Sequence, residues 1–247
     1  MVLFIGGMTG FLAGSLGLGG GFILVPLLVI AGFPFSVAVG SSLAYIVFVG
    51  LAGAIQHRRQ GSCSVRLALV MICGGVITAQ LGAIATTFVG SAVLEGLLTL
   101  LLLGVGVRTL FVKGGEVANE GEAYVVNVPK GIAVGGIVGF LSGLLGVGGG
   151  FILIPLMILV MRVPVRVAMG TSLLTVTGLA ASGAVRHWLM GNGDLLLISV
   201  LVVGGVVGSP LGATAAKRTS GKVLRLAFCG MLFLFATGLL VSRLIHV

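Results

Sequence analysis

Charged residues are scarce in this sequence. Only 8% of its 247 residues are charged, and Asp and Glu together number five. A soluble domain of this length needs a far more charged surface to stay in solution. Hydrophobic residues make up 58% of the chain, and the mean hydropathy is +1.29. These values exclude an ordinary soluble domain and predict an integral membrane protein.

Cysteine and histidine are also rare, with three of each. The cysteines have no paired spacing, so the sequence predicts neither a disulfide framework nor a metal site, and it indicates no cofactor. The histidines all lie at the ends of apolar segments. A membrane hydrolase would need a nucleophile with a base, or metal ligands, inside those segments. We therefore predict no catalytic residues and no enzyme.

Acidic residues are too few to balance the basic ones, and the formal net charge is +9. The Lys and Arg residues lie between apolar stretches, where membrane proteins carry them in cytoplasmic loops. No basic run is interleaved with aromatic residues, as a nucleic-acid-binding surface would require. We predict no nucleic-acid partner, and we expect the apolar surface to face the lipid bilayer.

Long uncharged stretches are abundant. A helix of about 20 apolar residues spans about 30 Å of hydrocarbon. Four stretches of this kind carry no charge at all: Val37–Gln56, Leu67–Val89, Val167–Val185 and Leu195–Ala216. Two more stretches carry one charge near an end: Ser91–Val107 contains Glu95, and Val223–Ser242 contains Arg225. The sequence predicts an all-α polytopic membrane protein.

The chain also contains an internal repeat. Residues 10–26 read GFLAGSLGLGGGFILVP and residues 139–155 read GFLSGLLGVGGGFILIP, with 13 identities in 17 positions. The match continues through GSSL at residues 40–43 and GTSL at residues 170–173. We therefore expect the chain to consist of two copies of one unit.

The repeat divides the chain into a first membrane repeat, residues 1–112, a cytoplasmic connector, residues 113–129, and a second membrane repeat, residues 130–247. The first apolar segment of each half is about 30 residues long and would reach about 45 Å as one helix, too long for the bilayer core without strong tilt. It is broken in the middle by LGLGGG or LGVGGG. If it enters and returns as a re-entrant pair of half-helices, each half crosses three times, and the second half is inverted relative to the first.

The distribution of basic residues favours this inverted arrangement. It places twelve of the 14 Lys and Arg residues on the cytoplasmic side, as the positive-inside rule requires. If each broken segment crossed the membrane fully instead, eight of these residues would lie on one side and six on the other, which is no bias. The twelve are Arg58, Arg59, Arg66, Arg108, Lys113, Lys130, Arg162, Arg166, Lys217, Arg218, Lys222 and Arg225. We predict a multi-pass protein of the inner (plasma) membrane with both termini outside.

The two glycine-rich breaks are the candidate substrate site. Irregular backbone at membrane depth is costly unless it lines a cavity, and matching breaks in two inverted halves indicate a central site. A helix that begins at a triple glycine presents free amides and the positive end of its dipole, which suits a small anion. Close helix packing is the alternative explanation for the glycines. The candidate site glycines are Gly17, Gly19, Gly20 and Gly21 with Gly146, Gly148, Gly149 and Gly150.

Hydroxyl groups follow each break. Ser41 and Ser42 in the first half match Thr171 and Ser172 in the second. Their side chains are expected either to donate hydrogen bonds to the anion or to bond back to their own helix. We include all four in the candidate site.

Three titratable residues are candidates for proton coupling. His57 and His187 lie at matching positions near the ends of two spans, where histidine is usually interfacial. Glu95 is the one acid within an apolar span, and a carboxylate there is a functional candidate, although its place near the segment's start fits an interfacial position equally well.

The doubled glycine motif, followed in each half by a proline and then by GSS or GTS, resembles the sulfite exporter TauE/SafE family of bacterial and archaeal permeases. The resemblance covers nearly the whole chain. It implies a secondary transporter that exports a small sulfur oxyanion, such as sulfite, or an organosulfonate by alternating access. This expectation agrees with the small anion that the helix breaks favour.

Two other functions remain open at this point. Re-entrant segments from inverted repeats also build passive pores, so an anion channel is one alternative. A membrane accessory subunit that transports nothing itself is the other.

Overall fold

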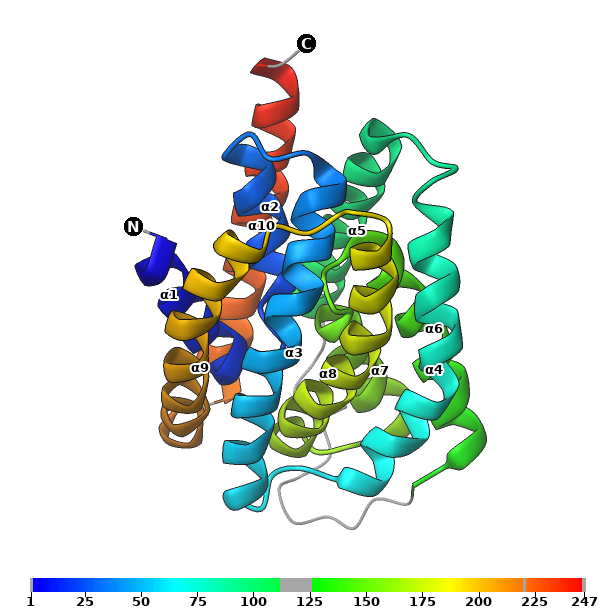
Figure 1. The fold of residues 1–247 in the computed structure, drawn as a ribbon. Coiled ribbons are helices and arrows are strands. Elements are labelled where there is room, and N and C mark those ends of the chain that lie inside the picture. The colour runs from blue at the N-terminus through cyan, green and yellow to red at the C-terminus, as the bar shows by residue number, and fades with distance from the viewer. Residues whose placement is uncertain (1, 112–125, 220, 246–247) are drawn as a thin grey trace.

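The computed structural model describes residues 2–111, 126–219 and 221–245. In these residues the chain is helical and contains no strand (Figure 1). Residues 112–125, which hold most of the predicted connector, lie outside the described part. The helices are α1 (Val2–Leu16), α2 (Gly21–Ile30), α3 (Phe35–Arg59), α4 (Val65–Ala85), α5 (Ser91–Phe111), α6 (Val128–Leu145), α7 (Gly150–Met161), α8 (Val165–Leu189), α9 (Leu195–Arg218) and α10 (Gly221–Ile245).

Five of these helices are long and apolar enough to cross a membrane. They are α3, α4, α6, α8 and α9. Four of them coincide with the four uncharged stretches of the sequence, so the prediction of an all-α polytopic membrane protein is confirmed.

Helix α6 is longer than the half-helix expected in the second broken segment. It has 18 residues and is about 27 Å long. It begins ahead of the apolar stretch because the Asn127 side chain accepts a hydrogen bond from the Lys130 amide at 3.0 Å, and Pro129 occupies the first turn. Helices α2 and α7, with 10 and 12 residues, are too short to cross.

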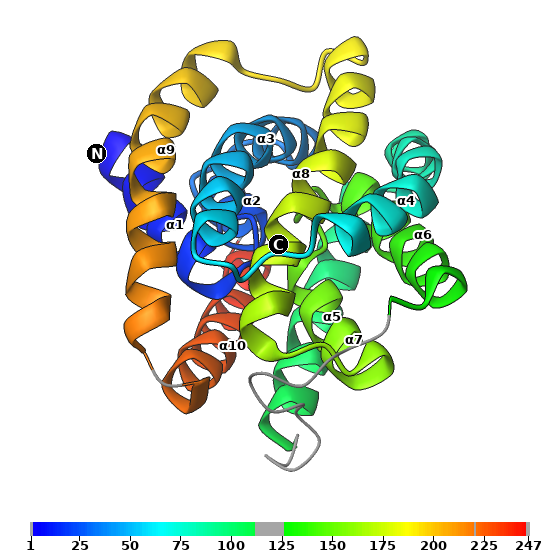
Figure 2. The same ribbon diagram turned by 90° about the horizontal axis from the view of Figure 1, so that it is seen from below.

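The helices of the described residues pack in a pattern that repeats. Helix α1 lies along α9, and α6 lies along α4 (Figure 2). Helix α3 also contacts α9, and α8 contacts α4. The pairs α3 with α8 and α5 with α10 complete the set. Each helix of the first half has an equivalent five places later in the chain, so that α1 corresponds to α6 and α3 to α8. Replacing every helix by its equivalent gives the same set of contacting pairs.

Helices α3 and α8 form the centre of the molecule and run in opposite directions (Figure 1). The loop after α3 is bonded to the start of α8, because the Ser64 amide donates to Thr171 Oγ1 at 2.9 Å. The loop after α8 is bonded to the start of α3 in the same way, because the Asp194 amide donates to Ser41 Oγ at 3.4 Å. Each end of this pair is therefore closed by a loop from the other half.

Small residues bring α1 close to α9 and α6 close to α4. A Cβ atom on Gly6, Gly10 or Gly14 would collide with the backbone of α9, and one on Gly135, Gly139 or Gly143 would collide with that of α4. Close backbone approach of this kind is how helices associate inside a membrane, where lipid offers no hydrophobic driving force. These glycine stripes therefore fix the two outer helix pairs around α3 and α8.

Candidate anion-binding site

Each glycine-rich segment breaks a helix in two. Helix α1 ends at Leu16 and α2 begins at Gly21, while α6 ends at Leu145 and α7 begins at Gly150. The helix starts expected from the sequence are thus confirmed. The backbone between the helices is left-handed, a conformation that suits glycine because it has no Cβ: φ is +74°, +76° and +86° at Gly17, Gly19 and Gly20, and +68°, +71° and +69° at Gly146, Gly148 and Gly149.

The two breaks meet in the protein core. A Cβ atom on Gly21 would lie 2.9 Å from the carbonyl oxygen of Gly146, and one on Gly150 would lie 2.7 Å from that of Leu18. The N-termini of α2 and α7 therefore lie next to the opposite break. The structure thus brings together the two sets of glycines that the sequence singled out.

Two apolar side chains fill the space between the breaks. A Cβ atom on Gly19 would lie 2.8 Å from Val176 Cγ1 and 3.2 Å from Ile46 Cγ2. One on Gly148 would lie 2.7 Å from the same Val176 methyl group and 2.9 Å from Ile46 Cδ1. Ile46 comes from α3 and Val176 from α8, and both are 0% exposed. In this conformation the centre of the site is closed by hydrocarbon.

The amides of both breaks lack hydrogen-bond partners within the residues that the structure describes. They belong to Gly19, Gly20 and Gly21 and to Gly148, Gly149 and Gly150. All six residues are buried. A buried amide without a partner costs about 1–3 kcal/mol. Two helix N-termini with free amides also carry partial positive charge, so the arrangement suits an anion with several acceptor oxygens.

Ser42 and Ser172 occupy equivalent positions but differ in bonding. Ser42 Oγ donates to the carbonyl oxygen of Gly146 at 2.9 Å, which ties α3 to the second break. Ser172 is 0% exposed, and its hydroxyl has no hydrogen-bond partner among the residues that the structure describes. Ser172 corresponds to Ser42 in the repeat, and among the described residues its buried hydroxyl is unused.

Ser41 and Thr171 hold loops. Their oxygens accept the bonds from the Asp194 and Ser64 amides described above. The glycine before each hydroxyl lets the loop come close, because a Cβ on Gly40 would collide with the carbonyl oxygen of Asn192. The sequence could not reveal this role, since it depends on a loop from the other half of the chain.

The two histidines are buried inside the protein near the ends of α3 and α8. His57 is 3% exposed and His187 is 0% exposed. Each Nε2 lies 3.0 Å from a backbone carbonyl oxygen, that of Gly14 for His57 and that of Gly143 for His187. These bonds draw the rings into the protein. Glu95 is separate from both breaks, because it lies partly exposed on α5, which packs mainly against α10.

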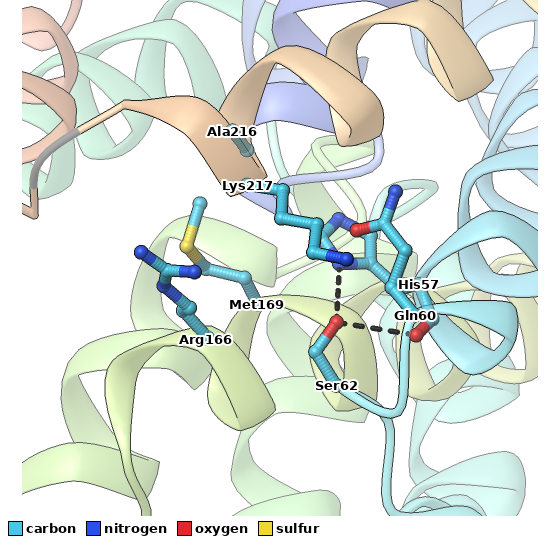
Figure 3. A pocket seen from close by; sticks show the side chains of 7 residues that line it. All are labelled: His57, Gln60, Ser62, Arg166, Met169, Ala216 and Lys217. Atoms are coloured by element: carbon cyan, nitrogen blue, oxygen red, sulfur yellow. Dashed lines mark hydrogen bonds between the residues drawn. The ribbon is translucent and has the colours of Figure 1, made fainter. Parts of the chain in front are cut away.

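A basic pocket lies beside the first break, and sequence reasoning missed it (Figure 3). It has a volume of about 60 Å³. The end of α3 with the following loop, the start of α8 and the end of α9 line it with His57, Gln60, Ser62, Arg166, Met169, Ala216 and Lys217. None of these residues is acidic. The signal in the sequence is the positive charge of Arg166 and Lys217, which also contributes to the predicted orientation of the chain.

The fold and the paired helix breaks define a polytopic membrane transporter. The chain belongs to the sulfite exporter TauE/SafE family, which it matches over residues 2–239. This is a family of transporters, so the expectation that the protein is not an enzyme is confirmed.

Relatives from bacteria and an archaeon match nearly the whole chain. A probable membrane transporter protein of Xylella fastidiosa (strain 9a5c) is 32% identical over 88% of this chain and 84% of its own length. The probable membrane transporter protein YdhB of Bacillus subtilis is 28% identical over 95% of this chain and 100% of its own length. A probable membrane transporter protein of Methanocaldococcus jannaschii is 24% identical over 94% of this chain and 91% of its own length. No solved structure matches the chain.

Proposed function

We propose that this protein is a secondary transporter that exports a small sulfur-containing anion, such as sulfite or an organosulfonate, by alternating access. The anion binds between the two glycine-rich breaks. The observation that carries the proposal is the set of buried, unpartnered amides at the N-termini of α2 and α7, which lie against one another in the core. The family description names sulfite, which is an anion of this class.

The proposal assigns different roles to the four hydroxyl residues. Ser172 donates to the bound anion, because its hydroxyl is buried and unused in the fold. Ser42 can turn from Gly146 to the anion as the site fills. Ser41 and Thr171 act indirectly by keeping the loops in place.

Alternating access requires that the centre open to each side in turn. Ile46 and Val176 close it in the present conformation, so we interpret this structure as an occluded state. Because Ile46 belongs to α3 and Val176 to α8, a small shift between these antiparallel helices would open the space between the breaks. His57, His187 and Glu95 stay our candidates for proton coupling.

The proposal places the two halves, residues 1–112 and 130–247, as inverted repeats in the inner (plasma) membrane, with connector 113–129 in the cytoplasm and both termini outside. The antiparallel arrangement of α3 and α8 and the exchangeable helix pairs support it. The basic residues support it as well, since eight of the predicted twelve lie on helix ends and loops at the lower end of Figure 1. Lys113 and the side chains of Arg108, Lys222 and Arg225 lie outside the described residues.

The direct test is a ligand screen on the purified protein. A ligand that binds only the folded state raises the unfolding temperature in a concentration-dependent way. We expect sulfite, thiosulfate or sulfoacetate to stabilise the protein, with sulfate and chloride as the comparison anions. An equal response to all five, or none, would remove the sulfur-anion assignment.

Flux measurements separate a carrier from the two alternatives. In proteoliposomes a carrier gives a saturable flux that depends on a coupling ion. A flux that rises linearly with concentration would support the channel instead. Stable copurification with a partner and no flux from the purified protein would support the accessory subunit.

A further inference from the structure

Arg186 lies near the end of α8, at the opposite end of the molecule from the basic pocket. Its side chain is half-buried, and the buried Nε atom has no hydrogen-bond partner within the described residues. In that part of the chain the side chain also forms no other hydrogen bond and no ion pair. A cation partly withdrawn from water without a counter-charge is unfavourable. The position therefore calls for an anionic group that the described chain does not supply.

The equivalent residue of the first half is bonded within the protein. The repeat pairs Arg186 with Gln56 and Ile84 with Thr214. Gln56 Nε2 donates to Thr214 Oγ1 at 3.0 Å, which joins α3 to α9. Helices α8 and α4 are the equivalent pair, but Ile84 stands where the first half has the threonine, and its side chain offers no acceptor. The second half thus has a charged donor at this position and no partner for it.

A second polar side chain lies at the same level as Arg186. Helices α4 and α8 run in the same direction (Figure 1), and Ser182 Oγ donates to the carbonyl oxygen of Val76 at 2.7 Å. Arg186 is one turn beyond Ser182, and Gln80 is one turn beyond Val76. Gln80 is exposed, and its side chain makes no hydrogen bond with the residues that the structure describes. A guanidinium and a carboxamide are therefore available on neighbouring helices.

The surface around Arg186 is apolar. Val185 and Leu189 on α8 and Leu81 on α4 are exposed. In a membrane protein such side chains face the acyl chains of lipids. Trp188, two residues after Arg186, is also exposed, and tryptophan is enriched where the hydrocarbon meets the headgroups. A soluble anion gains nothing from this apolar surface, whereas a lipid with an anionic headgroup matches both the charge and the hydrocarbon.

We propose that Arg186 and Gln80 bind the phosphate of a phospholipid, in the leaflet at this end of the molecule, with the acyl chains along Val185, Leu189 and Leu81. The guanidinium presents a planar set of N–H donors that matches two phosphate oxygens, and the Gln80 carboxamide donates to a third. This lipid site goes beyond the proposed function, because it holds whether or not an anion passes between the breaks.

A single variant and a matched control test the lipid site on the purified full-length protein in a non-ionic detergent. Arg186→Gln removes the charge and introduces the residue that the first half carries at position 56. Arg59→Gln removes one charge from an exposed position at the other end of the molecule. Both variants lower the net charge by the same amount, so a general attraction of anionic lipid to a basic protein cancels in the comparison.

The measurement is the unfolding temperature as a function of the mole fraction of phosphatidylglycerol in the micelles. A lipid that binds only the folded state raises this temperature. We expect the half-stabilising mole fraction to rise about 10-fold or more in Arg186→Gln and less than about twofold in Arg59→Gln, because only the first loses charge-assisted bonds to phosphate. Arg186→Lys keeps the charge without the planar donors and should fall between wild type and Arg186→Gln. Equal values in Arg186→Gln and Arg59→Gln would overturn the site.

Two further probes identify the group that is bound. Diacylglycerol with the same chains lacks the phosphate, so wild type and Arg186→Gln should respond to it equally. Glycerol 3-phosphate carries the phosphate without the chains and should stabilise the wild type far less than phosphatidylglycerol does. Stabilisation by glycerol 3-phosphate as strong as that by the lipid would indicate a site for soluble oxyanions and would overturn the lipid assignment.

A double variant keeps the test decisive if Arg186→Gln alone fails to fold. Arg186→Gln with Ile84→Thr copies the bonded pair of Gln56 and Thr214, so it supplies an internal hydrogen bond in place of the lipid. We expect this variant to fold without added lipid and to lose the response to phosphatidylglycerol as Arg186→Gln does. A wild-type response in the double variant would show that the lipid does not bind through Arg186.

Discussion

The Nε2 atom of His57 lies 3.0 Å from the carbonyl oxygen of Gly14, and this contact joins the end of α3 to the last turn of α1. A carbonyl oxygen only accepts hydrogen bonds, so Nε2 carries the hydrogen. The second half repeats the contact between His187 and Gly143, also at 3.0 Å. The two rings differ at Nδ1: that of His57 lies 3.1 Å from Ser62 Oγ, whereas that of His187 has no partner in the described part of the chain. Each histidine thus positions the helix that leads into a break.

Replacement of either histidine by alanine should destabilise the protein. His57→Ala and His187→Ala each leave a buried carbonyl oxygen without its donor, and we expect the free energy of unfolding to fall by about 1–3 kcal/mol. Thermal or denaturant unfolding in detergent measures the loss. Gln56→Ala is the control, because its hydrogen bond to Thr214 is exposed and should contribute less than about 0.5 kcal/mol. Losses no larger than in this control would contradict the role of the histidines.

The glycines of the GSS and GTS motifs should not tolerate alanine. A Cβ on Gly170 collides with the carbonyl oxygen of Ser62, and one on Gly40 collides with that of Asn192. We expect Gly40→Ala and Gly170→Ala each to cost at least about 2 kcal/mol of stability. Gly104→Ala is the matched control: no atom lies within 4 Å of its Cβ position on α5, so a helical alanine should gain up to about 1 kcal/mol. Similar melting temperatures for all three variants would refute the loop contacts.

Ser42 and Ser172 give a pair of variants with opposite expected effects. Ser42→Ala loses the 2.9 Å bond to Gly146 and should cost about 1 kcal/mol of stability. Ser172→Ala removes a hydroxyl that has no partner within the described residues, so stability should be unchanged or slightly higher. Because a hydrogen bond to a charged group contributes about 1.5–3 kcal/mol, Ser172→Ala should weaken anion binding about 10-fold or more. Titration of unfolding temperature against sulfite measures both quantities, and wild-type affinity in Ser172→Ala would exclude this hydroxyl from the site.

Cysteine labelling in intact cells tests the membrane orientation. Thr87 and Arg59 are exposed residues near opposite ends of the molecule. In a cysteine-free background an impermeant maleimide should label Thr87→Cys in intact cells, and Arg59→Cys only after permeabilisation. The native Cys63 is a poorer reporter, because burial raises the pKa of its thiol although the Arg58 charge partly opposes this. Labelling of Arg59→Cys from outside would reverse the orientation.

The features that the sequence predicted are those that adjacent residues determine. Uncharged stretches of membrane length gave four of the long helices, and each triple glycine gave the start of a short one at Gly21 or Gly150. What could not be predicted depends on contacts between distant segments. Ser41 and Thr171 serve as loop anchors only because Asp194 and Ser64 reach them from the opposite half.

The basic pocket was missed for the same reason. Arg166 and Lys217 each follow an ordinary pattern for a loop beside a membrane span, and only the packing of the start of α8 beside the end of α9 brings them to one pocket. The contacts of the histidine rings could not be predicted either, because the carbonyl oxygens that bind them belong to α1 and α6.

The closed centre of the site gives a final prediction, which concerns Val176. One of its methyl groups faces both Gly19 and Gly148, so Val176→Ala removes hydrocarbon from the space between the two breaks. The change should cost about 1–3 kcal/mol of stability, and the smaller side chain should let the anion pass more easily when the protein is closed. We therefore expect Val176→Ala to raise the uncoupled leak of sulfite from proteoliposomes. Val185→Ala is the control on the same helix, because Val185 is 60% exposed and remote from both breaks. A leak that rises equally in the two variants reports a general loosening of α8, whereas a rise confined to Val176→Ala shows that this side chain closes the path.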